Sequence, residues 1–345
     1  MSGSPLAILF FILSTSVLSC LPSESPNLAD KDTPPGQNGK KKKGFILSSS
    51  GEDYQVKKMA LLGDSIGVGF LSDTMFGSMP PKQSPIFGLV NAALSGAMSN
   101  PHQTLMRIGE IYKDKHLSPW ISTSKECEAH SCLLSLSNDN AVNLATLGAE
   151  ISQVTGDQLP RVKDDTDYIV VEVGANDFCQ HGFNKESFLG KYRKLVKALS
   201  ARAAKPVVLF VPIPNIPELF SITANSTAFT MNLFIPIPVK CSDIRDGGFL
   251  GRENAFCPRL GKGANLNEEA TNWQTLNESL EKIISEEKNP KLVFAKSLMA
   301  QKMTKNLLAA DCFHPSKNAI KVMAEQTWLA VKDLLISKGE ARDEE

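Results

Sequence analysis

The sequence has no excess of charge of either sign and no apolar run long enough to cross a membrane. Its 37 Lys and Arg balance 37 Asp and Glu, for a formal net charge of +0. The one dense basic run, Lys40 to Lys43, lies in a Pro-, Gly- and Ser-rich segment typical of a solvated linker, so we expect no nucleic-acid partner. The run Leu6 to Leu13 is far shorter than the roughly 20 residues of a membrane span, so no transmembrane helix is predicted.

The cysteines also lack the spacing of a metal site. No two of them are arranged as Cys-x-x-Cys, and the histidines within a few positions of a cysteine, His130, His181 and His314, lie far apart in the sequence. Structural zinc sites draw their ligands from such closely spaced pairs. The sequence therefore predicts no metal centre.

The N-terminus resembles an export signal. An apolar run leads into small and β-branched residues just before Cys20, as a signal peptidase requires. From residue 21 to about 51 there is little that could be buried. We expect a signal peptide over 1–19, a flexible tether over 20–53 and a folded domain over 54–340.

The odd number of cysteines bears on whether Cys20 is lipidated. Val17-Leu18-Ser19-Cys20 resembles the lipobox of bacterial lipoproteins, and lipidating Cys20 would reduce the seven cysteines to an even six. The chain would then be an outer-membrane lipoprotein, touching the membrane through its lipid, if its source is bacterial. Plain cleavage near the same bond, giving a secreted protein, is the alternative.

Three disulfides fit an exported chain. Six cysteines allow 15 pairings. Spacing favours Cys127 with Cys132 and Cys241 with Cys257, which would leave Cys179 and Cys312 as the third pair.

Short apolar runs alternate with longer helical ones in the folded part. The runs predict strands at Met59–Leu62, Ala141–Leu144, Tyr168–Val173, Val207–Val211 and Leu292–Ala295. Apolar residues at intervals of three and four predict helices at Glu186–Ala203, Glu268–Glu287 and Pro315–Ser337. This alternation predicts an α/β fold, a three-layer α/β/α sandwich around a five-stranded parallel, flavodoxin-like sheet. Ligands of such sheets bind at the carboxyl ends of the strands.

Two long excursions interrupt the alternation. The first, between the first two strands, includes Pro80-Pro81 and Trp120, and the second runs from Ile213 to about Lys262. Long excursions in a compact domain often serve as lids or binding loops. The apolar residues of the second could form either a satellite core or a wall that binds an acyl chain.

Three segments that could carry catalytic residues follow predicted strands. Gly63-Asp64-Ser65 would present Ser65 on a sharp strand-to-helix turn, as suits a nucleophile, or would simply cap a helix. In Asn143 to Ala149, Gly148 would open the next helix with a bare backbone N–H. In Gly174 to Asp177, Asn176 could direct an amide donor at an oxyanion, or could be an ordinary turn residue.

The fourth segment is Asp311-Cys312-Phe313-His314. A carboxylate one short turn before an imidazole can fix its tautomer, which leaves the other ring nitrogen to take a proton from a serine hydroxyl. Any one of the five histidines alone would favour a surface or core role. The position of His314 after three other such segments favours catalysis.

In this order the four segments resemble the blocks of the SGNH, or GDSL, hydrolases. The blocks run from residue 59 to about 320, with Ile66 where the family usually has Leu. Cys179 and the Asp-Cys-Phe-His form of the last block further resemble the phospholipase B-like branch. The resemblance implies ester hydrolysis without a cofactor. It implies Ser65 as nucleophile, His314 as base and Asp311 as its orienting carboxylate, with an oxyanion hole from Ser65, Gly148 and Asn176.

The sequence thus predicts a serine hydrolase acting on lipid or other small-molecule acyl esters, with no obligate protein partner. Two alternatives stay open: a carbohydrate O-deacetylase of the same fold, and a tethered binding module without catalysis. Exposed aromatic residues along an open groove would favour the deacetylase, and a deep apolar channel would favour acyl chains. With only three Trp and four Tyr, the composition leans toward lipid.

Overall fold

The computed structural model describes residues 56–70, 72, 76, 118–122, 129–232, 236–245 and 256–336. Its centre is a five-stranded sheet with the order β2-β1-β3-β4-β7, in which every neighbouring pair is parallel. The strands are β1 (Met59–Gly63), β2 (Ala141–Asn143), β3 (Tyr168–Glu172), β4 (Val207–Val211) and β7 (Leu292–Phe294). The predicted sheet is confirmed, and each strand ends within one residue of its expected bounds.

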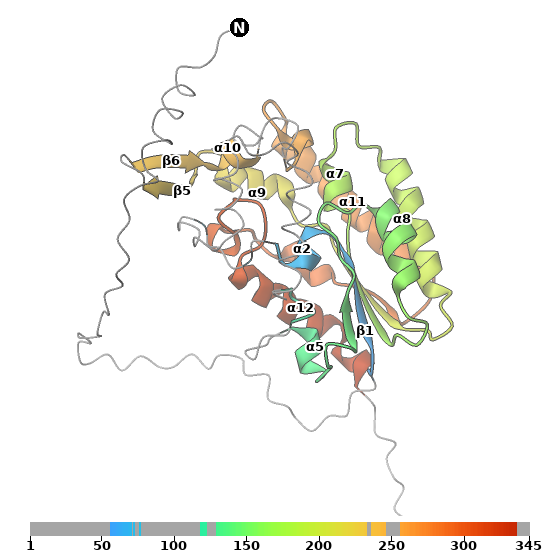
Figure 1. Ribbon diagram of the computed structural model, residues 1–345. Coiled ribbons are helices and arrows are strands. Elements are labelled where there is room, and N and C mark those ends of the chain that lie inside the picture. Colours follow the sequence, from blue (N-terminus) through green and yellow to red (C-terminus); the bar gives the residue numbers. More distant parts are fainter. Residues whose placement is uncertain are drawn as a thin grey trace, which may run out of the picture.

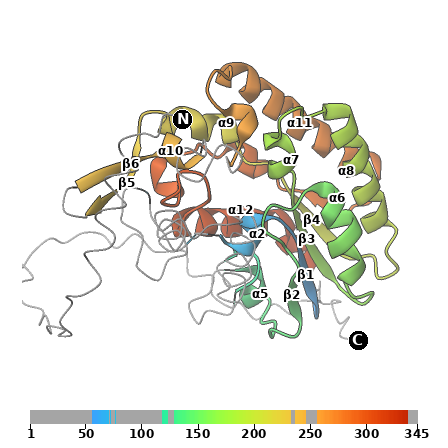
Figure 2. The same ribbon diagram turned by 45° about the horizontal axis from the view of Figure 1, so that its top comes forward.

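Helices cover both faces of this sheet, which makes three layers. One face carries α6 (Ile151–Gln153), α8 (Lys185–Ser200) and α11 (Leu266–Glu286), and the other carries α5 (His130–Leu133) and α12 (Lys317–Leu335) (Figures 1 and 2). The expected α/β/α sandwich is therefore confirmed.

Strand β1 shows why its sequence is a continuous apolar run. Met59 and Leu61 pack with the core on the α12 side, and Ala60 and Leu62 pack with the core on the α8 side. Side chains alternate between the faces of a strand, so a strand covered on both faces needs an apolar residue at every position.

The three predicted long helices are present, and their starts and ends differ from the expected bounds by one to three residues. Helix α8 begins after Asn184, whose side-chain oxygen accepts a hydrogen bond from the Ser187 N–H at 2.9 Å. Helix α12 begins at Lys317, two residues later than expected. The reason is that Pro315 pairs with Leu308 in an isolated antiparallel bridge, which holds it outside the helix.

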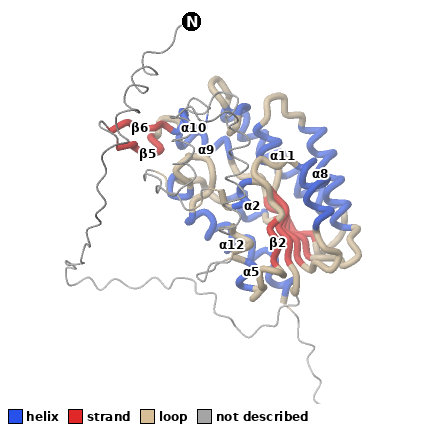
Figure 3. The backbone as a smooth tube through the Cα atoms, viewed as in Figure 1, coloured by secondary structure: helices blue, strands red, loops and turns tan. Residues whose placement is uncertain are grey.

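Several shorter elements connect the layers. They are α2 (Ser65–Val68), η1 (Val154–Gln158), η2 (Leu159–Arg161), α7 (Ala175–Cys179), α9 (Ile216–Thr223), β5 (Thr227–Asn232), β6 (Pro236–Lys240), α10 (Cys241–Arg245), η4 (Pro258–Leu260), η5 (Lys296–Ala300) and η6 (Lys305–Leu307). The hairpin of β5 and β6 was not expected from the sequence. It lies apart from the central sheet, beside α10 (Figures 1 and 3).

The described parts of the two excursions join the main core. Trp120, from the first, is fully buried and donates its indole N–H to the Thr327 hydroxyl on α12 at 3.1 Å. Phe229, on the hairpin, is buried in the core on the α12 side. The apolar residues of the second excursion are therefore core residues in part, and Pro80-Pro81 lies outside the described residues.

None of the helices within the described ranges is long and apolar enough to span a membrane. The expected signal peptide, tether and Cys20 lie before residue 56, outside the described residues. They stay predictions.

His130 ties the first excursion to the sheet and to α12. It is fully buried, its Nδ1 lies 2.8 Å from the Tyr168 hydroxyl oxygen, and its Nε2 lies 3.0 Å from the Ala324 carbonyl oxygen. Burial lowers the pKa of His130 to about 4. Protonation of this ring would place a cation in the core, where its ionised form is strongly disfavoured.

This shift predicts a loss of stability in mild acid. The unfolded chain takes up the His130 proton near its ordinary pKa of about 6.5, but the folded chain does so only near 4, so stability falls between these pH values. Their separation corresponds to about 3 kcal/mol. Denaturant unfolding at pH 7.5 and 4.5 should show that His130→Gln loses less stability on acidification than the parent. An equal loss in both proteins would contradict a buried neutral His130.

Candidate active site

The site begins at the turn that joins β1 to α2. Ser65 is the first residue of α2, and Asp64 caps this helix by accepting a hydrogen bond from the Ile66 N–H at 3.0 Å. A Cβ on Gly63 would lie 2.4 Å from the Glu172 carbonyl oxygen, so the close passage of β1 beside β3 requires glycine there. The turn thus holds Ser65 at the carboxyl edge of the sheet, as the sequence predicts.

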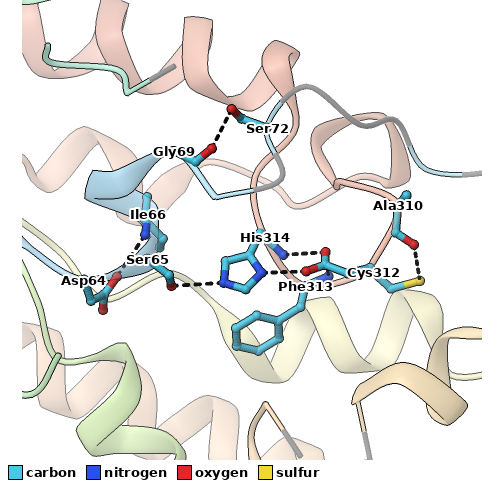
Figure 4. A network of polar contacts seen from close by, with 10 residues as sticks. Asp64, Ser65, Ile66, Gly69, Ser72, Ala310, Cys312, Phe313 and His314 are labelled. Carbon is cyan, nitrogen blue, oxygen red and sulfur yellow. Dashed lines mark hydrogen bonds and ion pairs between the residues drawn. The ribbon is translucent and has the colours of Figure 1, made fainter. Parts of the chain in front are cut away.

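A hydrogen-bonded chain links Ser65 to the loop before α12. His314 Nε2 lies 3.0 Å from Ser65 Oγ, and His314 Nδ1 lies 2.6 Å from Asp311 Oδ2 (Figure 4). Asp311 is fully buried, and its other oxygen accepts the backbone N–H groups of Phe313 and His314 at 3.0 Å each. Residues 249 positions apart in the chain are thereby brought into hydrogen-bond contact.

This arrangement has a definite chemical capacity. The Nδ1–H of a neutral His314 donates a hydrogen bond to Asp311, so Nε2 carries a lone pair that can accept the Ser65 hydroxyl proton. Phe70, Phe256 and Phe313 surround the imidazole, with ring centroids 4.9 to 5.5 Å from that of His314. The ring is held in place and largely shielded from water.

Asn176 lies next to the nucleophile's turn. It follows β3, and its amide nitrogen lies 3.1 Å from both Asp64 Oδ2 and the Ala149 carbonyl oxygen. An amide nitrogen has two hydrogens to donate, so both are directed at protein acceptors. To stabilise an oxyanion, one of them must turn toward the substrate. The oxyanion role of Asn176 stays a prediction.

Gly148 lies in a turn. The expectation that it opens the next helix is therefore wrong. Helix α6 starts only at Ile151, with Glu150 as its N-cap. Gly148 has a φ of 75°, a left-handed conformation that favours glycine, and a Cβ there would meet nothing within 4 Å. Ala149, the next residue, carries the carbonyl that Asn176 contacts. The oxyanion roles of the Gly148 and Ser65 N–H groups stay predictions.

Glu172 is a functional candidate that the sequence reasoning missed. It is the last residue of β3, is buried, and its Oε2 accepts the backbone N–H groups of Asp64 at 3.3 Å and Gly67 at 3.1 Å. Its carboxyl also hydrogen-bonds that of Asp64. The signal was present as a lone acid in the apolar run Tyr-Ile-Val-Val-Glu-Val.

The Asp64 and Glu172 carboxyls form a buried acidic pair. Burial raises the pKa of Glu172 well above its usual range, and the charge of Asp64 raises it further. Burial also raises the pKa of Asp64, although hydrogen bonds from Ile66 and Glu172 oppose this. Because the pKa of Glu172 is raised the more, we expect the pair to hold one proton, carried by Glu172, with Asp64 ionised.

Two expected disulfide pairings are wrong. The structure joins Cys179 to Cys257 and Cys241 to Cys312, in place of Cys241 with Cys257 and Cys179 with Cys312. Proximity in sequence misled the prediction, because Cys241 lies beside Cys312 in the loop of His314, whereas Cys257 lies beside Cys179 at the end of α7. Cys132 is disulfide-bonded, but its expected partner Cys127 lies outside the described residues.

Each observed disulfide ties the second excursion to a different catalytic loop. Cys179 ends α7, the helix that carries Asn176, whereas Cys312 lies between Asp311 and His314. Cys312 has a φ of 63°, which is uncommon for a residue other than glycine. The excursion is thus covalently fixed to both sides of the site.

No group of three or more His, Cys, Asp or Glu side chains in the described part of the chain is arranged to hold a metal ion. A largely apolar pocket opens beside Ser65 and His314, between α9 and the start of α12.

Substitutions at Glu172 test the acidic pair. A neutral Glu172 can be replaced by Gln, which still accepts the two N–H groups and donates to Asp64. Glu172→Ala leaves these groups without a partner, at a cost of about 1–3 kcal/mol each. Denaturant unfolding should therefore show Glu172→Gln near the parent and Glu172→Ala clearly destabilised. Equal losses in both variants would contradict a protonated Glu172.

The disulfides can be tested by peptide mapping and by substitution. Non-reduced digests should contain peptides joining Cys179 to Cys257 and Cys241 to Cys312. The double variant Cys241→Ala/Cys312→Ala should lower Tm, since loss of a native disulfide typically costs about 2–5 kcal/mol. It should lower kcat more than Cys179→Ala/Cys257→Ala does, because it frees the loop that holds His314. Equal kcat in the two double variants would contradict this account.

The chain has similarities to known proteins. The family model for GDSL-like lipase/acylhydrolase matches residues 59–327. Among solved structures, the chain is similar to the acetylxylan esterase Axe2 of Geobacillus stearothermophilus, with 12% identity, a TM-score of 0.40, and 81% of this chain and 96% of that one covered. It is also similar to the extracellular lipase of Streptomyces rimosus, with 11% identity, a TM-score of 0.38, and coverage of 81% and 99%.

A comparison with curated proteins finds no match. The family model, in contrast, covers most of the chain and all four segments singled out in the sequence. The chain belongs to the GDSL-like lipase/acylhydrolase family and is an ester-hydrolysing enzyme.

Proposed function

We propose that the protein hydrolyses carboxylic esters through an acyl-enzyme, with Ser65 as nucleophile, His314 as general base and then acid, and Asp311 as the orienting carboxylate. The observation that carries this proposal is the unbroken hydrogen-bonded chain from Ser65 Oγ through His314 to Asp311, at 3.0 and 2.6 Å. The three side chains are 7%, 4% and 0% exposed, so water competes little for their hydrogen bonds.

The reaction follows from this geometry. His314 Nε2 takes the hydroxyl proton as Ser65 Oγ attacks the ester carbonyl, and the resulting oxyanion is stabilised by the N–H groups of Ser65, Gly148 and Asn176. His314 then gives its proton to the leaving alcohol. Water, deprotonated by His314, attacks the acyl-enzyme and releases the carboxylic acid, which restores Ser65.

Two other functions were left open by the sequence. A binding module without catalysis would have no need to keep Ser65, His314 and Asp311 in hydrogen-bond contact. A carbohydrate O-deacetylase shares the whole mechanism and differs only in the surroundings of Ser65. The apolar pocket beside Ser65 supports lipid or other acyl esters over acetylated sugars.

The proposed roles predict a rank order of kinetic losses. Ser65→Ala and His314→Ala should each abolish nearly all turnover, and the double variant should be no worse, because the two act as a unit. Asn176→Ala should lower kcat about 10²- to 10³-fold with little change in KM, since an oxyanion donor acts mainly in the transition state. Asp311→Asn should be impaired but measurable.

Steady-state hydrolysis of p-nitrophenyl acetate by each purified variant, with circular dichroism to confirm folding, checks this order. Turnover by folded Ser65→Ala comparable to the parent would show that another residue is the nucleophile. A parent inert on every ester tried would restore the binding module.

We also propose that residues 1–19 direct export and that Cys20 carries a lipid, with residues 20–53 as a leash to the domain over 54–340. The lipobox-like tetrapeptide and the odd number of cysteines support this. In a bacterial host, Cys20→Ala should move the protein from the membrane fraction to the soluble fraction. Firm membrane binding of Cys20→Ala would rule the lipid anchor out.

A further inference from the structure

The pocket beside Ser65 has three walls that meet at the catalytic residues. One wall is the segment after β4 together with α9, the second is the connection between β7 and η6, and the third is the first part of α12. Ser65, His314 and Asn176 stand where these walls converge. A ligand in the pocket can therefore reach the reacting atoms.

Helix α12 gives one face to the pocket and the other to the core. Pro315, just before the helix, and Ala319, Val322 and Met323 line the pocket, with the spacing of residues on a single helical face. Thr327, Trp328 and Val331 are buried on the core side. At 1.5 Å per residue, the part of α12 from Lys317 to Met323 extends about 9 Å from the catalytic loop.

The other two walls are apolar as well. Ile213, Ile216 and Leu219 come from the second excursion, and Leu298, Met303 and Leu307 come from the connection after β7. These walls are fastened together, since Glu218 Oε2 accepts from both the Met303 N–H at 3.5 Å and the Asn215 side chain at 3.1 Å. Gln326 on α12 donates to Gln301 Oε1 at 3.0 Å.

The lining offers little to a polar ligand. It contains no Lys or Arg among the described residues, and its one carboxyl, that of Glu172, is committed to Asp64 and Gly67. Away from the catalytic residues, only the Asn215 and Gln301 side chains have hydrogen-bonding groups, and both are already bonded to Glu218 and Gln326. A sugar would lose its hydrogen bonds to water there without replacement.

We propose that this pocket binds the acyl portion of the substrate, an unbranched aliphatic chain of medium length such as octanoyl. The inference rests on the proposed esterase function and specifies its substrate class. The acyl group stays attached to Ser65 through both halves of the reaction, whereas the alcohol leaves after the first. Contacts with the acyl chain can therefore stabilise both transition states. A pocket that opens at Ser65 is for this reason better assigned to the acyl portion than to the alcohol.

The experiment compares two ester series with the full-length parent protein. The first series varies the acyl chain, from p-nitrophenyl acetate through butyrate, octanoate and palmitate. The second keeps acetate and varies the alcohol, from ethyl to octyl acetate. We expect kcat/KM to rise from acetate to octanoate and to fall at palmitate, and to change little along the alkyl acetates.

Val322→Phe places a phenyl ring in the pocket from α12. Leu329→Phe is the control, because it places a phenyl ring at an exposed position of the same helix. Val322→Phe should lower the ratio of kcat/KM for octanoate to that for acetate at least tenfold, because even one methylene displaced from an apolar pocket typically changes kcat/KM by about tenfold or more. Leu329→Phe should leave this ratio within about twofold of the parent.

Each outcome has a separate meaning. No hydrolysis of any ester by the parent would overturn the proposed function itself. Hydrolysis with acetate as the best acyl group, or an unchanged octanoate-to-acetate ratio in Val322→Phe, would overturn the acyl pocket and leave the esterase function standing. A preference that follows the alcohol series would assign the pocket to the leaving group instead.

Discussion

The Asp311 carboxylate is the group on which the rest of the site depends. It is fully buried. It accepts hydrogen bonds from the Nδ1–H of His314 and from two backbone N–H groups of its own loop. One side chain thus sets both the backbone path of the loop and the tautomer of the imidazole. The loop is fixed further by the bridge between Leu308 and Pro315 and by the disulfide from Cys312.

A pair of buried carboxyls, Asp64 and Glu172, organises the opposite side of the site. Glu172 accepts the backbone N–H groups of Asp64 and Gly67, and Asp64 accepts that of Ile66 together with the side-chain amide of Asn176. Asn176 lies at the end of β3 and Ser65 at the end of β1, neighbouring strands at which the order of the sheet reverses. Parallel sheets open a crevice at such a point. The catalytic groups are therefore placed by topology and fixed by buried carboxyls.

The sequence predicted the sheet well because each strand is covered on both faces and so reads as an unbroken apolar run. It singled out Ser65 and Asn176 because each follows a strand at one edge of the sheet, and Asp311 and His314 because a carboxylate precedes an imidazole by three positions. It failed where long-range geometry decides. The pairings of Cys241 and Cys257 join residues more than seventy positions apart, and Glu172 acts through partners more than a hundred positions away. No local pattern encodes either contact.

The central claim, that His314 activates Ser65 as a nucleophile, is tested most directly by covalent labelling with a fluorophosphonate, which reacts with activated serine hydroxyls. Mass spectrometry of the labelled parent should find the phosphonyl group on the peptide containing Ser65, and folded His314→Ala should label at least about a hundredfold more slowly. Labelling at another residue, or an unchanged labelling rate in His314→Ala, would contradict the account.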